Sequence, residues 1–189
     1  MVKYNYFENL EQLSDCATRA VGLACGSRSD GEGGSMSAIR RSCDRIICEL
    51  EDALFSDFLP PLERDNIAAC AHCLSRVVDQ ATELLGNLKK GAVGARINEE
   101  ARICVELAER LRDTISLLRH IRKPDETPDV QGFRKLLAEG RQAHATMLGR
   151  LHTGVLPHSY AQTIILTGRL RAELSHSFDE LVEVMLNNI

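Results

Sequence analysis

Apolar residues recur at helical spacing along most of the 189-residue chain. From Met36 to about Phe58 they step by three or four positions, which is the spacing of a helix that packs lengthwise against another. The same rhythm continues after two adjacent prolines and returns in four further runs, and no run alternates as a half-buried strand would. The pattern therefore predicts six helices at approximately 4–25, 36–58, a run after the prolines that ends near 88, 101–118, 133–151 and 159–186.

Glycine, serine and proline gather between these runs, where breakers of regular structure are expected. A Gly/Ser-rich segment at about 27–35 predicts a mobile loop, and further connections are expected at 86–94, 123–132 and 154–157. Helices of about 20 residues span roughly 30 Å, so short loops between them favour antiparallel neighbours. The expected fold is all-α: one elongated, antiparallel, up-and-down helical bundle of about six helices over residues 1–189.

Composition agrees with this fold and narrows the classes of function. The chain is 44% hydrophobic but only 4% aromatic, which suits aliphatic helix packing. A net charge of -4 argues against nucleic acid as the main ligand. No window is long and apolar enough for a membrane span, and no signal-peptide core is present. The seven cysteines are expected to be reduced core residues. We expect a cytoplasmic protein without membrane insertion.

The stretch FLPPLERDN, residues 58–66, predicts a corner between two long helices. Pro60 and Pro61 disfavour helical geometry in the residues before them, so the incoming helix is expected to stop near Phe58. Pro61 is expected in the first turn of the next helix, where its missing N–H is not needed. Glu63 and Asp65 would then lie in that first turn, where the helix dipole favours negative charge.

The same region resembles the PhoU-like phosphate transport regulators, cytoplasmic proteins associated with Pit-type phosphate transporters. The resemblance rests on Asp44, Leu54, Phe58 and the run PLERDNI at 61–67. The N-terminal YFENLEQLSDCATRAVGLA is also similar to the first helix of that family. The resemblance implies a helical bundle, usually oligomeric, in which acidic pairs hold a multinuclear metal cluster of iron. These pairs are E-x-x-x-D on the second helix and D-x-x-x-D on the third.

This chain departs from that pattern at the positions of the metal ligands. On the second helix Arg40 replaces the first acid of the pair, so only Asp44 remains acidic. On the third helix Ser75 replaces the first acid, so only Asp79 remains. The corresponding positions on the fifth and sixth helices are occupied by Leu137 with Arg141 and by Arg171 with Ser175. We therefore expect the metal site to be lost or reduced to a weak mononuclear one at Asp44 and Asp79.

Other constellations each have a structural explanation beside a functional one. Cys70-x-x-Cys73 has the spacing of half a zinc site, but Cys70 lies on an apolar seam. Glu173-x-x-His176 matches half of a di-iron motif, and surface residues share that spacing. The acidic pairs of 11 with 15 and of 109 with 113 have metal-binding spacing but also fit a solvated charged face.

Three arginines cluster on the second helix, Arg40, Arg41 and Arg45, and Arg64 lies beyond the corner. Such a group is a candidate contact for an anion or an acidic partner. Pairing with nearby carboxylates such as Glu49 is the competing explanation. No nucleophile elbow, P-loop or dinucleotide fingerprint occurs in the sequence.

These observations predict a non-enzymatic regulator or accessory protein of phosphate transport without a cofactor. It would act through contact with a membrane phosphate transporter or its signalling partner, at the inner face of the membrane, and form a homo-oligomer. One alternative is a metalloprotein or metal-dependent enzyme that keeps iron or another divalent metal at Asp44 and Asp79. Another is a purely structural helical oligomer.

Overall fold

The computed structural model describes residues 4–26, 35–57, 60–89, 99–121 and 127–188. All regular structure in these ranges is helical, with no strand, which confirms the all-α prediction and its six long helices. The elements are α1 (Tyr6–Ala24), α2 (Met36–Ser56), α3 (Arg64–Lys89), α4 (Glu99–Leu117), η2 (Leu118–His120), α5 (Val130–His152), η3 (His158–Tyr160) and α6 (Ala161–Asn187).

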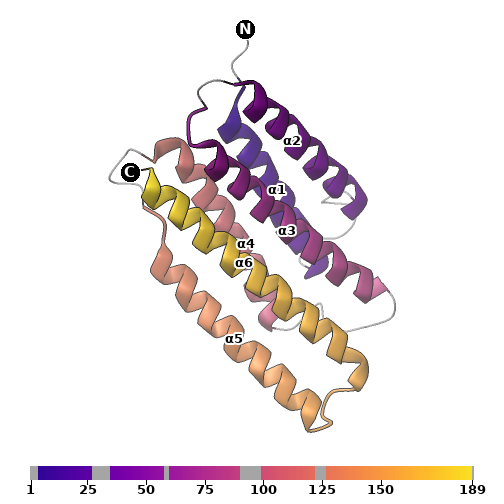
Figure 1. Ribbon diagram of the computed structural model, residues 1–189. Helices are drawn as coiled ribbons and strands as arrows, with labels where there is room; N and C mark the ends of the chain where they lie inside the picture. The colour runs from indigo at the N-terminus through magenta and orange to yellow at the C-terminus, as the bar shows by residue number, and fades with distance from the viewer. Residues whose placement is uncertain (1–3, 27–34, 58–59, 90–98, 122–126, 189) are drawn as a thin grey trace.

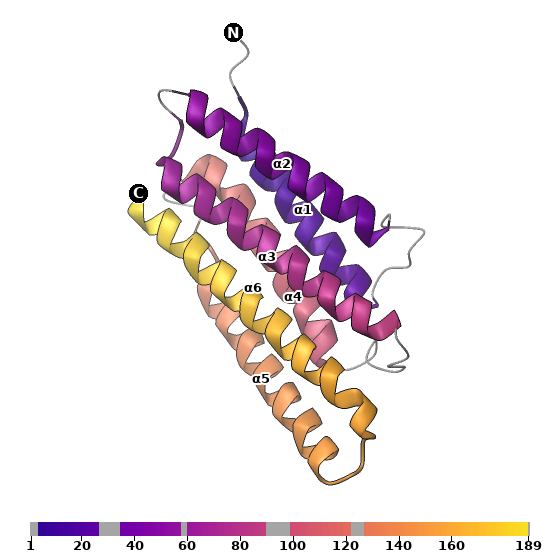
Figure 2. The ribbon, with the colours of Figure 1, turned by 45° about the vertical axis from the view of Figure 1, so that its right-hand side comes forward.

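Four helices form the centre of the bundle and two lie outside it. The central helices are α1, α3, α6 and α4, each packed against the next, while α2 lies against α1 and α3, and α5 lies against α4 and α6. Figures 1 and 2 show all six lying lengthwise beside one another, with the turn between α5 and α6 projecting past the other helices. None of the described helices is long and apolar enough to span a membrane.

The predicted apolar seams become the core. On α2 and α4 every predicted seam position is buried, and on α3 only Leu88, at the far end, is partly exposed. On α1 the predicted seam residue Phe7 is partly exposed, and in the outer helix α5 His144, Met147 and Leu151 of the predicted seam are partly exposed as well. The second half of α5 thus extends beyond the helices that cover its first half.

Two phenylalanines centre the packing between α5 and α6. The rings of Phe133 and Phe178 are stacked, with centroids 3.7 Å apart and planes 5° from parallel, and each side chain is 1% exposed. Phe133 lies in the first turn of α5, where Asp129 caps the helix by accepting a hydrogen bond from the Gly132 N–H at 2.9 Å. The cap and the ring stack together fix where α5 begins.

The double-proline corner joins α2 to α3, but α3 begins later than the sequence pattern predicts. α2 ends at Ser56 and α3 begins at Arg64, so the prediction that Pro61 lies in the first helical turn was wrong. The Ile67 N–H donates to the Glu63 carbonyl at 3.1 Å, which places Glu63 at the helix boundary. Only Asp65 lies in the first turn as expected.

Side chains tie this corner together. The Nε of Arg64 donates to the Leu54 carbonyl at 2.9 Å, and its terminal nitrogen donates to the Asp57 carbonyl. These bonds satisfy carbonyls at the end of α2 that lack helical partners. The Tyr6 hydroxyl donates to the Asp57 carboxylate at 2.8 Å and so joins α1 to the corner. Burial, followed by this hydrogen bond, raises the pKa of Tyr6.

Two predicted connections differ from the structure. α3 continues to Lys89, so the expected turn at 86–94 begins later than its glycine suggested, and residues 90–94 lie outside the described ranges. α5 already begins at Val130, within the connection expected at 123–132. Of the loop predicted at about 27–35, only Ser35 is described, and it caps α2 by accepting from the Ala38 N–H at 3.3 Å.

Phenylalanines of opposite exposure test this packing. Phe178→Ala empties a fully enclosed site, so it should lower the free energy of unfolding by about 3–5 kcal/mol. Phe55, on α2, is 91% exposed, and Phe55→Ala should change that free energy by no more than about 0.5 kcal/mol. Urea unfolding followed by circular dichroism measures both variants. Equal losses would contradict the assigned burial.

Candidate functional site

Three of the residues that the sequence singled out, Arg40 and Asp44 on α2 and Asp79 on α3, lie where these two helices meet. We call this surface the α2–α3 face. A terminal nitrogen of Arg40 lies 2.8 Å from a carboxylate oxygen of Asp79, and each side chain is about half exposed. The ion pair bridges the two helices at two positions that the family resemblance assigns to metal ligands. A guanidinium therefore stands beside the carboxylate that was expected to bind metal.

Asp44 is exposed on the same face. Beneath it, burial raises the pKa of the Cys43 thiol to about 11, a hydrogen bond with Ser75 lowers it, and the charges of Asp44 and Asp79 raise it further. Both carboxylates thus lie near one buried thiol at the α2–α3 seam. Among the described residues, no group of three or more His, Cys, Asp or Glu side chains is placed to hold a metal ion.

The other candidate arginines have separate roles. Arg45 pairs with Glu49 one turn along α2 at 2.9 Å, as the competing explanation required. Arg41 is exposed and forms no ion pair within the part of the chain that the structure describes. The Arg64 side chain donates hydrogen bonds to carbonyls at the end of α2. The four arginines therefore do not converge on one anion site.

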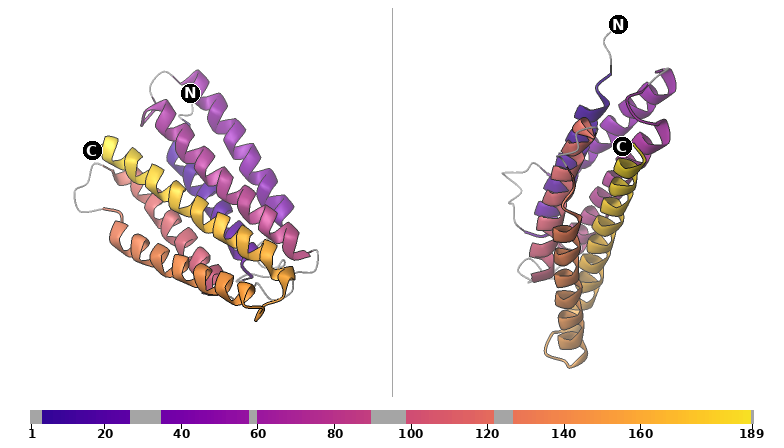
Figure 3. Two further views of the ribbon diagram at one scale, coloured as in Figure 1. Left: turned by 60° about the horizontal axis from the view of Figure 1, so that its bottom comes forward. Right: turned by 90° about the vertical axis from the view of Figure 1, so that its left-hand side faces the viewer.

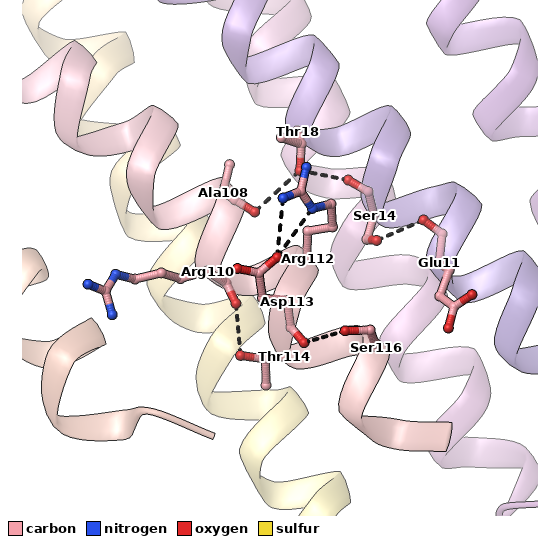
Figure 4. A network of polar contacts seen from close by, with 9 residues as sticks. All are labelled: Glu11, Ser14, Thr18, Ala108, Arg110, Arg112, Asp113, Thr114 and Ser116. Atoms are coloured by element: carbon pink, nitrogen blue, oxygen red, sulfur yellow. Dashed lines mark hydrogen bonds and ion pairs between the residues drawn. The ribbon is translucent and has the colours of Figure 1, made fainter. Parts of the chain in front are cut away.

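The two acidic pairs with metal-like spacing lie apart on α1 and α4, near the contact shown in Figure 4. There the Thr18 hydroxyl donates to the Ala108 carbonyl at 3.3 Å and joins the helices. Glu11 pairs with Arg119 at 2.8 Å, and Asp113 pairs with its neighbour Arg112 at 3.2 Å. These carboxylates belong to a charged surface, as their spacing also allowed.

The remaining two candidate motifs are also held by packing and pairing. Cys70 and Cys73 are 1% and 0% exposed, and burial raises the pKa of both thiols, that of Cys73 to about 12. Glu173 accepts from the Nε of Arg76 at 2.7 Å, while His176 faces Glu180 at 3.2 Å. Neither motif presents its two members to a common ligand.

A buried carboxylate lies at the junction of α4, α5 and α6. Glu100, the second residue of α4, has a side chain that is 1% exposed. One of its oxygens accepts from the Nε of Arg171 on α6 at 2.9 Å, and the other lies 2.9 Å from the Nδ1 of His144 on α5. Because a carboxylate only accepts, Nδ1 is the protonated ring nitrogen. We call these three residues the Glu100 clasp.

Two glycines provide the space for the clasp. A Cβ at Gly140 would lie 2.8 Å from the Cδ of Arg171, and a Cβ at Gly168 would lie 2.6 Å from the Cε1 of His144. Contacts this short do not occur, so a larger residue at either position would displace its partner. The glycines therefore let the Arg171 side chain lie close against α5 and the His144 imidazole lie close against α6.

A pocket of about 760 Å³ lies beside the clasp, between α4, α5 and η3. Its volume is within the usual range for small-molecule sites. Glu99 and Glu139 carry carboxylates into it, and Arg150 carries the opposite charge. Its lining is Glu99, Ile103, Glu139, Gln142, Ala143, Thr146, Met147, Arg150, Leu156 and Tyr160.

Sequence reasoning missed the clasp. The apolar seam of the run 133–151 predicts only that His144 is packed, and Arg171 is marked only by standing where the family has an acid. Glu100 stands in the polar run NEEAR beside Glu99, and nothing in the pattern says which of the two is buried. The available signal was Gly140 and Gly168 within helical runs, where glycine usually has a packing reason.

Searches of protein-family models and of curated proteins find no match to this chain.

Gly168→Ala tests the clasp directly. The added methyl group should push His144 off Glu100 and lower the free energy of unfolding by about 1–3 kcal/mol. In a His144→Ala background Gly168→Ala should no longer destabilise the protein. It should instead raise the free energy of unfolding slightly, as Gly→Ala usually does within a helix. Urea unfolding of all four proteins measures the coupling.

The matched control for this cycle is Gly149→Ala. A Cβ there meets no atom within 4 Å, so Gly149→Ala should stabilise α5 by about 0.5–1 kcal/mol. A Gly168→Ala penalty that persists without the His144 ring would contradict the assigned contact.

Proposed function

We propose that the chain is a non-enzymatic accessory or regulatory protein of phosphate transport that acts by contact with a membrane phosphate transporter or its signalling partner. The antiparallel, PhoU-like order of the helices and the formation of a homo-oligomer are part of this proposal. Support comes from the all-helical bundle and from the run at 61–67, which carries the resemblance and leads into the first turn of α3.

The Arg40–Asp79 ion pair is the observation that carries this proposal. The positive charge of Arg40 at 2.8 Å opposes the approach of a divalent cation to Asp79. Because both side chains are half exposed, the pair also offers a guanidinium fork and carboxylate oxygens to an approaching protein. The α2–α3 face is thus better suited to recognition than to holding a metal cluster.

The alternative of a metalloprotein or metal-dependent enzyme at Asp44 and Asp79 rests on the nearness of both carboxylates to Cys43. Two carboxylates leave most positions of a six-coordinate site to water. A purely structural helical oligomer is the remaining alternative, which needs only the continuous core.

Capture of a Pit-type phosphate transporter from detergent-solubilised membranes tests the proposal. The immobilised chain should retain the transporter. The double variant Arg40→Asp, Asp79→Arg should bind at least about tenfold less, because it keeps an internal ion pair but inverts the charges presented to the partner. A matched control inverts another exposed pair across two helices, Glu83 and Arg169, and should leave capture unchanged.

Elemental analysis of the purified chain decides between this function and the metal alternative. The proposal expects iron, zinc and manganese well below one atom per chain. Stoichiometric metal that disappears in an Asp44→Ala, Asp79→Ala variant would establish the alternative, and equal capture by all variants would remove the α2–α3 face from the proposal.

A further inference from the structure

The pocket of about 760 Å³ beside the Glu100 clasp has one wall that is formed by a single side of α5. The residues of this wall recur every three or four positions and therefore share one side of the helix. They are Glu139, Gln142, Ala143, Thr146, Met147 and Arg150. Arg150 follows Glu139 by eleven positions, which places them about 16 Å apart along the helix axis. The pocket thus has a carboxylate at one end of this wall and a guanidinium at the other.

Both of these charges are without an ion-pair partner. Within the described ranges neither Glu139 nor Arg150 lies within ion-pair distance of an opposite charge. Arg102, which feels the charge of Glu139, is itself paired with Glu99 and Glu106. The hydrogen bond from Arg102 lowers the pKa of Glu99 and so keeps this second lining carboxylate ionised. The Glu139 end of the pocket is therefore suited to a cation, and the Arg150 end is suited to an anion.

The lining between the two charges is largely apolar. Ile103 of α4, Met147 of α5 and Leu156 of the following turn all contribute to it. Gln142 and Tyr160 add hydrogen-bonding groups. Figure 3 shows that the end of α5 projects with the turn past the other helices, so the Arg150 end of the pocket lies on the projecting part.

These properties define the class of ligand. A matching molecule is extended, carries a cation at one end and an anion at the other, and is mainly apolar between them. An extended peptide advances about 3.3–3.6 Å per residue, so about four or five residues span the distance from Glu139 to Arg150. Its α-amine and α-carboxylate are both charged at neutral pH. The pocket volume lies in the usual range for ligands of this size.

We propose that this pocket binds a short, mainly apolar peptide with free ends, its N-terminal amine at Glu139 and its C-terminal carboxylate at Arg150. The planar guanidinium of Arg150 can bond to both oxygens of the carboxylate. Ile103 and Met147 would cover the apolar side chains of the peptide. This binding does not depend on transporter contact at the α2–α3 face.

Isothermal titration calorimetry with the peptide Ala-Leu-Ser-Leu-Ala tests the proposal. The peptide with free ends should bind the wild-type chain with a Kd below about 1 mM. Acetylation of its N-terminus removes the cation, and amidation of its C-terminus removes the anion. Each modification should weaken binding about fivefold, because each removes one exposed ion pair.

Variants of the two charged residues assign each end of the peptide. Glu139→Gln should weaken binding of the unmodified peptide about fivefold and abolish the effect of acetylation, while amidation should still weaken binding. Arg150→Gln should do the converse. The matched control is Arg141→Gln, which alters an exposed arginine of α5 outside the pocket lining and should bind all three peptides as the wild type does.

A wild-type chain that does not bind the unmodified peptide at millimolar concentration would overturn the proposal. So would a loss on acetylation that persists in Glu139→Gln. ω-Aminododecanoic acid carries the same two charges on an apolar chain without amide groups, so it should bind more weakly than the peptide because it offers no hydrogen bonds to Gln142 and Tyr160. Tighter binding of this compound would assign the pocket to an ω-amino acid instead of a peptide.

Discussion

The arrangement of α4, α5 and α6 depends on the contacts of one buried carboxylate, that of Glu100. A carboxylate that is 1% exposed is costly to bury unless it is paired and hydrogen-bonded. Here the Arg171 guanidinium on α6 supplies the opposite charge, His144 on α5 supplies a second hydrogen bond, and the N-terminal end of α4 adds a favourable dipole. The clasp can therefore form in only one register of α5 and α6 against α4. Apolar contacts such as the Phe133–Phe178 stack give stability, while the clasp excludes a slip of one helical turn.

The Glu100 clasp also explains how α5 extends beyond the bundle. After Gly140 the helix has few buried positions, and His144 is its last polar tie to α4. The remaining residues form the end of α5, which projects past the other helices together with the turn to α6 (Figure 2).

Much of the fold follows from the spacing of apolar residues, because a lengthwise helical seam repeats every three or four positions whatever its neighbours are. The seams of α2, α3 and α4 were predictable for that reason. The start of α3 was not, because proline geometry permits a helix to begin at Pro61 without requiring it. Arg64 fixes the start of α3 by donating hydrogen bonds to carbonyls of α2, and the spacing of apolar residues does not show such a tertiary contact.

The candidate site, too, could be predicted only in part. The family resemblance singled out Asp44 and Asp79 on the second and third helices, but it could not show that Arg40 pairs with Asp79. Spacing could not show that Glu100, rather than Glu99, is buried.

Amide hydrogen exchange in the Glu100→Gln variant tests the role of the clasp most directly. The variant loses the charge that holds Arg171 and His144, while the packing of α1, α2 and α3 is untouched. Amide hydrogens in the second half of α5 and in the first turns of α6 should exchange faster than in the wild type, while those of α1 to α3 should exchange at the wild-type rate. Exchange that rises equally in all six helices, or that stays unchanged in α5, would contradict the claim that this carboxylate holds α5 and α6 in place against α4.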